Sequence, residues 1–214
     1  MINGDGRHTV VATIDAIKDA PPPKDVTQLR ALLGKLNCYR RFLPDVATVF
    51  EPLRELLRKG TVEKWNSEQQ TVFDTAKELL QSAKLVVHLS SDMDPIIASV
   101  SSNYGIGVVL SHKMPNGTEH PIEYVSRSLN PAQRNYLTIS KESFAIIVGL
   151  KKFRQFLYGH RFTVKTDHKP LEGLLGKTKG ISSQASSRVR RWSLTHAAYE
   201  YKIQYKAGKS KWKY

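Results

Sequence analysis

The middle of the chain changes from strand-like to helix-like spacing of its apolar residues, and this change constrains the fold more than any other feature. Three short apolar stretches typical of β-strands occupy residues 95–101, 105–113 and 120–127. Between the last two, Asn116-Gly117 is a strong hairpin-turn signal. From Pro131 the apolar residues recur at helical spacing, until Gly159 ends the helix.

The rest of the chain extends this alternation of strands and helices. After the long helix we expect a strand, two helices and a last strand, at residues 161–167, 169–175, 188–198 and 200–206. The resulting order, β-β-β-α-β-α-α-β, is an antiparallel hairpin system followed by crossover helices. It predicts an α/β fold in which a mixed sheet is flanked by helices.

The first third of the chain is predicted to be helical. After Pro21-Pro22-Pro23, either Asp25 or Thr27 caps a helix that runs to about Phe42. A second helix spans residues 46–59, and the two are expected to pack as a small hairpin. Ser67, with Gln70 three residues later, predicts a capping box for a third helix.

The positive charge is concentrated at one end of the sequence. The formal net charge is +14, and residues 151–214 contain 16 Lys and Arg but only 3 Asp and Glu. Such an excess favours a polyanionic partner, because Lys and Arg release the counterions that condense on phosphates. The alternative is a solubilising surface without a specific partner.

Cysteine content and hydropathy restrict the class of protein. The single cysteine, Cys38, excludes a disulfide framework within the chain and a cysteine-based zinc site. No apolar stretch reaches the length of a transmembrane helix, and no signal peptide opens the chain. We therefore expect an intracellular protein, cytoplasmic or nuclear, without a membrane partner.

Three segments, in this order, resemble the RNase H domain of reverse transcriptases from gypsy-type LTR retrotransposons. They are residues 98–110 (ASVSSNYGIGVVL), 140–146 (SKESFAI) and 165–171 (KTDHKPL). Residues 33–44 (LGKLNCYRRFLP) resemble the start of the thumb-like region that follows the polymerase palm. The resemblance implies a fragment of a Pol polyprotein, with an RNase H-like domain at residues 63–214 after a thumb-like helical region at 1–62.

The resemblance also implies which residues would cleave RNA. The family uses four acids with two Mg²⁺ ions, and the first-strand aspartate falls on Val100. The helix acid falls on Glu142 and the fourth-strand acid on Asp167, while no acid follows Gly208-Lys209 at the place of the last. Glu142 and Asp167 would hold Mg²⁺ weakly as catalytic remnants, so cleavage of the RNA strand of hybrids is expected to be lost.

The sequence also allows other interpretations of these residues. Glu142 could be a solvated residue on the surface of a helix, and Asp167 could cap the helix that follows it. The chain could also be an active RNase H in which Asp92 or Asp94 replaces the lost ligand, or a domesticated scaffold without a catalytic role.

Nucleic acid, as an RNA/DNA hybrid or a duplex, is the partner that the charge and the resemblance together imply. The candidate phosphate contacts are basic residues of the thumb-like segment and of the last third of the chain: Arg40, Arg41, Arg188, Arg190, Arg191, Lys206, Lys209 and Lys211. Nearby aromatic residues could stack on bases, although Trp192 is expected to pack in the core.

Overall fold

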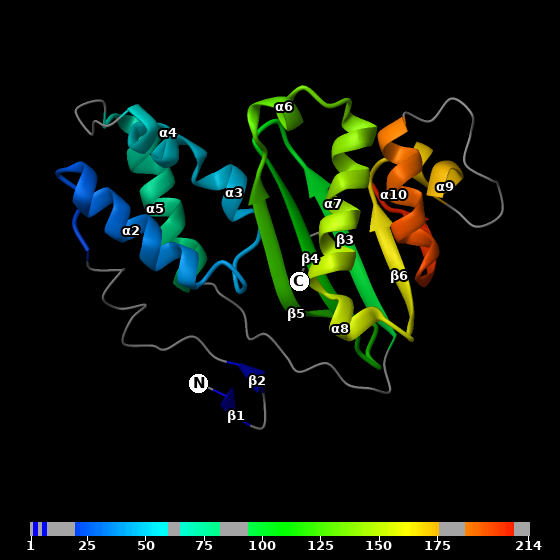
Figure 1. Ribbon diagram of the computed structural model, residues 1–214. Coiled ribbons are helices and arrows are strands. Elements are labelled where there is room, and N and C mark those ends of the chain that lie inside the picture. Colours follow the sequence, from blue (N-terminus) through cyan, green and yellow to red (C-terminus); the bar gives the residue numbers. More distant parts are fainter. Residues whose placement is uncertain are drawn as a thin grey trace.

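A computed structural model describes residues 2–3, 6–7, 20–59, 65–81, 94–175 and 187–207. Its centre is a five-stranded sheet with the order β5-β4-β3-β6-β7 (Figure 1). The strands are β3 (Pro95–Ser101), β4 (Gly105–Lys113), β5 (Glu119–Ser128), β6 (Arg161–Thr166) and β7 (Glu200–Tyr205). Near the N-terminus, β1 (Ile2–Asn3) and β2 (Gly6–Arg7) form a separate two-stranded pair.

The sheet is mixed, and its strand directions follow from the connections. Hairpins join β3 to β4 and β4 to β5, so these pairs are antiparallel. Helical crossovers lead to β6 and then to β7, so β6 is parallel to both β3 and β7. Gly117 adopts the left-handed region in the β4–β5 turn, with φ of 84°. The predicted mixed sheet is therefore confirmed.

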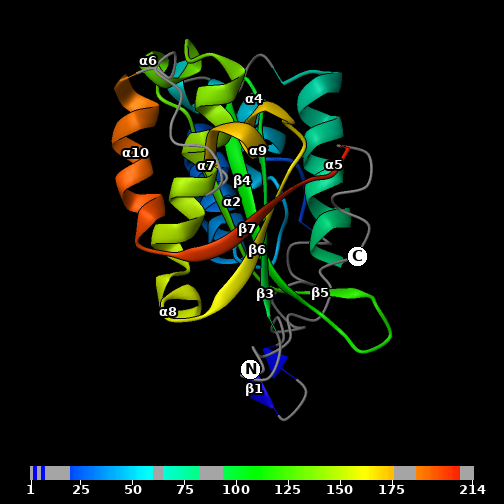
Figure 2. The ribbon, with the colours of Figure 1, turned by 90° about the vertical axis from the view of Figure 1, so that its right-hand side faces the viewer.

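The helices of the second half pack against one face of the sheet (Figures 1 and 2). After the short α6 (Pro131–Arg134), α7 (Thr138–Lys152) crosses β3 and β4, and α10 (Ser187–Ala197) lies beside it. Two short helices, α8 (Arg154–Leu157) and α9 (Pro170–Leu175), flank β6. The continuous helical pattern predicted up to Gly159 is interrupted at Phe153, which lies between α7 and α8.

The helical region has an apolar core of its own. It contains α2 (Val26–Cys38), α3 (Val46–Val49), α4 (Glu51–Lys59) and α5 (Ser67–Gln81). Buried side chains of α2, α3 and α5 form one cluster with Leu43 and Phe50, while Leu29, Leu53 and Leu56 form another. Helix α5 therefore packs with the helices that precede it.

The helix caps and boundaries predicted from the sequence are confirmed in part. The Asp25 side chain accepts a hydrogen bond from the Gln28 backbone at 2.8 Å, so Asp25 rather than Thr27 caps α2. The predicted capping box of α5 is displaced by one residue: Asn66 accepts from the Glu68 backbone, and its own N–H donates to the Gln69 side chain. The helix predicted over 46–59 is broken at Phe50 into α3 and α4.

Polar contacts fix the helical region against the sheet. Helix α3 lies along β4 and β5, and the Ala47 backbone N–H donates to the Ser126 hydroxyl at 2.7 Å. At the other end of the junction, the buried carboxylate of Glu51 is bound by Arg134 of α6 at 2.6 Å. Gly105 of β4 permits the close approach of α3 to the sheet, because a Cβ at Gly105 would lie 2.7 Å from the Cβ of Ala47.

No described helix is long and apolar enough to cross a membrane.

Gly149 sets the distance between α7 and the sheet, which gives a stability prediction. A Cβ at Gly149 would lie 2.8 Å from Cγ1 of Val108, a fully buried side chain. We expect Gly149→Ala to lower the free energy of unfolding by about 1–2 kcal/mol, because overpacking exceeds the gain in helix propensity. Chemical denaturation measures this change.

Two other helical glycines provide the matched controls. A Cβ at Gly34 in α2, or at Gly173 in α9, would meet no atom within 4 Å. Alanine at either position is expected to raise the free energy of unfolding by roughly 0.5–1 kcal/mol. Equal changes in the free energy of unfolding at all three positions would show that the close packing of α7 does not make the Gly149 substitution destabilising.

Candidate functional site

Glu142 lies in α7 close to the end of β3 and is buried, with 3% of its surface exposed. Its Oε1 atom accepts hydrogen bonds from the backbone N–H and the hydroxyl of Ser101, at 2.8 and 2.9 Å. The interpretation as a solvated surface glutamate is therefore wrong. The carboxylate joins α7 to the last residue of β3.

Val100 is the residue next to this contact and lies level with Asp167. Strand β3 pairs with β6 so that Ala98 is opposite Lys165. Continued by two residues, this register places position 100 level with Asp167, which is half-buried just beyond the end of β6. The three positions named from the sequence thus lie at the same end of the sheet, with a hydrocarbon side chain at position 100.

The Val100 side chain points away from α7. Successive residues of a strand face opposite sides of a sheet, and Ser101 faces Glu142. On the opposite face Val100 pairs with Gly107, and a Cβ at Gly107 would lie 3.3 Å from Cγ2 of Val100. The same Cβ would lie 3.7 Å from Oδ1 of Asp45, so a carboxylate of the helical region approaches position 100.

Asp45 was not among the residues identified from the sequence. It adopts the left-handed region, with φ of 47°, immediately before α3. Burial raises the pKa of its carboxyl group, and a hydrogen bond from the Thr48 hydroxyl at 2.8 Å partly opposes that rise. The Thr48 hydroxyl also lies 2.8 Å from the Ser102 hydroxyl at the end of β3. No spacing in the sequence relates residue 45 to residue 100.

The acids at this end of the sheet do not fit a two-metal centre. RNase H-like domains generally use Mg²⁺, which prefers several oxygen ligands in octahedral geometry. Throughout the described part of the chain, no three His, Cys, Asp or Glu side chains are grouped closely enough to hold a metal ion. One oxygen of Glu142 is already engaged by two donors of Ser101. Asp94, one of the two proposed substitutes, is exposed just before β3, and Asp92 lies outside the described residues.

The basic residues named from the sequence lie at separate places. Arg40 is exposed, and Arg41 pairs with Glu123 at 3.3 Å. Arg190 and Arg191 are exposed on α10, across α7 from the helical region (Figure 1). The backbone of Arg188 belongs to α10, and its side chain is not described. The amino group of Lys206 lies 3.9 Å from the Glu119 carboxylate. Lys209 and Lys211 fall outside the described residues.

The aromatic residue of the same cluster packs partly against the core. The Trp192 ring stacks on Phe144 of α7, with ring centroids 5.6 Å apart and the planes 27° apart. The side chain is half-buried.

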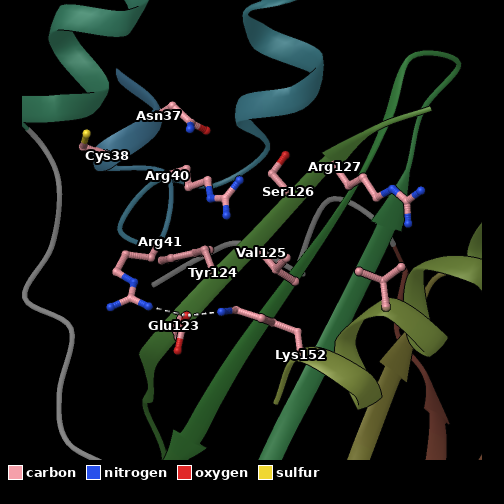
Figure 3. A pocket seen from close by; sticks show the side chains of 11 residues that line it. Asn37, Cys38, Arg40, Arg41, Glu123, Tyr124, Val125, Ser126, Arg127 and Lys152 are labelled. Atoms are coloured by element: carbon pink, nitrogen blue, oxygen red, sulfur yellow. Dashed lines mark hydrogen bonds and ion pairs between the residues drawn. The ribbon is translucent and has the colours of Figure 1, made fainter. Parts of the chain in front are cut away.

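Two hollows that share Lys152 gather basic residues from distant parts of the sequence, including Arg40 and Arg41 named above. The first, of about 460 Å³, lies between the end of α2 and β5 and is lined by Arg40, Arg41, Arg127 and Lys152 among others (Figure 3). The second, of about 560 Å³, is lined by Lys151, Lys152, Arg154, Gln155 and Tyr158. Figure 3 shows Glu123 between Arg41 and Lys152, which it binds at 3.3 and 3.4 Å.

Comparison with known proteins identifies a family and related polyproteins. Residues 91–199 match the RNase H-like domain found in reverse transcriptase. The chain is 33% identical, over 98% of its length, to the retrovirus-related Pol polyprotein from transposon opus of Drosophila melanogaster. It is 30% identical, over 91% of its length, to the transposon Tf2-3 polyprotein of Schizosaccharomyces pombe. It spans only 22% and 15% of the lengths of these two relatives.

Solved structures support the same fold. The foamy viral protease-reverse transcriptase in complex with an RNA/DNA hybrid aligns with 96% of this chain, at a TM-score of 0.72 and 19% identity, over 28% of its own length. The same viral protein in complex with dsDNA aligns with 94% of this chain, with the same score and identity, over 42% of its own length. The chain belongs to the family of RNase H-like domains found in reverse transcriptase.

Proposed function

We propose that this chain is a nucleic-acid-binding part of a retrotransposon Pol polyprotein whose RNase H centre has lost hydrolysis. The observation that carries the proposal is Val100, level with Asp167 and next to the Ser101 contact of Glu142. The motifs of residues 98–110 and 140–146 further support a gypsy-type parent element.

Loss of the acid at position 100 removes more than one metal contact. In two-metal hydrolysis a carboxylate shared by both ions fixes their separation and lowers the charge repulsion between them. A valine methyl group offers no lone pair, and the neighbouring hydroxyls of Ser101 and Ser102 are neutral. The reaction rate is therefore expected to fall by several orders of magnitude.

Binding of nucleic acid is proposed separately from cleavage. The net charge of +14 and the basic hollows beside β5 and α7 favour a phosphate-rich partner. The structurally similar foamy viral protein was solved with an RNA/DNA hybrid and with dsDNA. We infer the same partner class for this chain, recognised by backbone shape and charge.

A cleavage assay tests the loss of hydrolysis. The wild-type chain and Glu142→Gln are each incubated with a hybrid labelled in its RNA strand, with Mg²⁺ and with Mn²⁺. We expect no RNA cleavage by either protein beyond that of a no-protein control. Wild-type cleavage that disappears in Glu142→Gln would instead show a working RNase H, and Asp167→Asn serves as an independent check of such a result.

A further inference from the structure

The two basic hollows share one lining residue, and their basic residues are together called the basic tract. Lys152, at the end of α7, lines both of them. The cations of the basic tract come from three distant parts of the sequence: the segment after α2, strand β5, and the α7–α8 junction. They are Arg40, Arg41, Arg127, Lys151, Lys152 and Arg154.

The charge of the basic tract is nearly uncompensated. Glu123 is the one acid among its lining residues, against six cations. Within the described residues, Glu123 forms ion pairs with Arg41 and Lys152, and no acid forms one with Arg40, Arg127, Lys151 or Arg154. This surplus contrasts with Lys206, another proposed phosphate contact, which lies near Glu119.

Several cations of the basic tract are held in place before any ligand binds. Glu123 is mostly buried and holds Arg41 and Lys152 from opposite sides (Figure 3). The guanidinium of Arg127 lies 5.2 Å from the centre of the Phe144 ring, and that of Arg154 lies 5.3 Å from the Tyr158 ring. Side chains that are already ordered lose less conformational entropy on binding a phosphate.

Most of the basic tract lies away from the candidate nuclease site. Only Arg127 approaches it, because Arg127 pairs with Ile106, which in turn pairs with Ser101. Ten residues of α7 separate Glu142 from Lys152, which corresponds to about 15 Å along the helix. Tyr158 is 60% exposed beside Arg154, so the tract also offers an aromatic surface. Exposed aromatic rings next to cations are typical of sites that follow a nucleic acid strand.

We propose that the basic tract binds the sugar–phosphate backbone of a nucleic acid strand, along a path from the C-terminal end of α7 toward Arg127. This inference rests on the proposed nucleic-acid binding and adds its location. Binding there does not use Glu142 or Asp167, so the chain would retain a hybrid although its cleavage centre is incomplete. The α10 cluster of Arg190 and Arg191, named from the sequence, then contributes less.

Two charge-reversal variants, one in the basic tract and one on α10, test where the nucleic acid binds. Both change the net charge by the same amount. The basic-tract variant is Lys151→Glu with Arg154→Glu, and the matched control is Arg190→Glu with Arg191→Glu. All four side chains are exposed. Anisotropy of a labelled RNA/DNA hybrid gives the dissociation constant across a salt series from about 50 to 200 mM. Circular dichroism and thermal unfolding establish that both variants remain folded.

We expect the basic-tract variant to bind at least about tenfold more weakly than the wild type, and its log–log salt slope to decrease by roughly 2. The α10 variant should change affinity less than about threefold. If the charge reversal unfolds the chain, a milder variant, Lys151→Gln with Arg154→Gln, replaces it. This variant should weaken binding by about half as much on a logarithmic scale.

Three outcomes overturn the inference, and they are distinguishable from one another. An equal or larger loss in the α10 variant would locate binding there. Wild-type binding that is unchanged in the basic-tract variants would reject the tract alone and leave the proposed function standing. Absence of hybrid binding by the wild type at low salt would reject the tract and the proposed binding function together, in favour of a scaffold.

Discussion

The Val100→Asp variant is expected to cleave the RNA strand of an RNA/DNA hybrid at least about a hundredfold faster than the wild-type background, with Mn²⁺ as the more permissive ion. The new carboxylate would stand level with Asp167 and next to the Ser101 contact of Glu142. The variant would have three acids at this end of the sheet, where the wild type has two, and Mg²⁺ prefers several oxygen ligands.

Asp45 modifies this expectation. The Val100 methyl group and the Asp45 carboxylate both approach the same point above Gly107. A second carboxylate there would repel the first, and because Asp45 is already partly desolvated the pair would tend to take up a proton. We therefore expect Val100→Asp combined with Asp45→Asn to cleave faster than Val100→Asp alone.

The matched control is Val100→Asn, which has the shape of aspartate without its charge. It should remain at the wild-type background, and gel analysis of the labelled RNA strand measures all four proteins. If Val100→Asp cleaves no faster than Val100→Asn, then the rest of the site is also disabled, and residue 100 is not the decisive loss.

Acidification from pH 7 to pH 4 is expected to lower the free energy of unfolding by about 3 kcal/mol through His196 alone. The ring is 5% exposed on α10, and its Nδ1 lies 2.9 Å from the Tyr201 hydroxyl. Burial lowers the pKa of His196 to about 4, from an ordinary value near 6.5. Burial also raises the pKa of Tyr201, so that hydroxyl stays neutral over this range.

The sign follows from which state binds the proton. Between about pH 6.5 and pH 4 the unfolded chain is protonated at residue 196 and the folded chain is not, so stability falls as the pH falls. Burial also lowers the pKa of His112, which adds a contribution in the same direction.

Urea unfolding at several pH values measures this dependence in the wild type and in His196→Asn. The asparagine keeps a polar group near Tyr201 but does not titrate, so the difference between the two proteins isolates His196. Parallel pH profiles for the two proteins would show that residue 196 does not control acid stability.

The secondary structure was largely predictable because its signals are local. The strands at 95–101 and 105–113 were located to the residue, and Asn116-Gly117 formed the expected turn. The errors came where two local signals compete. Asn66 and Ser67 are both good capping residues, and in the structure Asn66 is the cap. A helical pattern over 46–59 ignored Pro52, which lacks an N–H and is best placed in the first turn of a new helix.

The sequence motifs predicted which residues lie at the candidate nuclease site, but not which other side chains contact them. Glu142 and Asp167 lie at the same end of the sheet as position 100, as the motif order implied. The Ser101 donors to Glu142 were not anticipated. Asp45 is 55 residues before Val100 in the chain, and no periodicity relates them. The candidate phosphate contacts were assigned by clustering along the sequence, which named Arg40 and Arg41 but did not relate them to Arg127, Lys151, Lys152 or Arg154.

The sequence by itself determined the kinds of elements, their order, and the hydrocarbon side chain at position 100, since these depend on each residue and its near neighbours. Only the tertiary structure decided which distant residues share a surface. Arg40, Arg127 and Lys152 line one hollow, although they come from the segment after α2, from β5 and from the end of α7. Such meetings depend on how helices and strands pack, and packing is a property of the whole apolar core that no short stretch of sequence encodes.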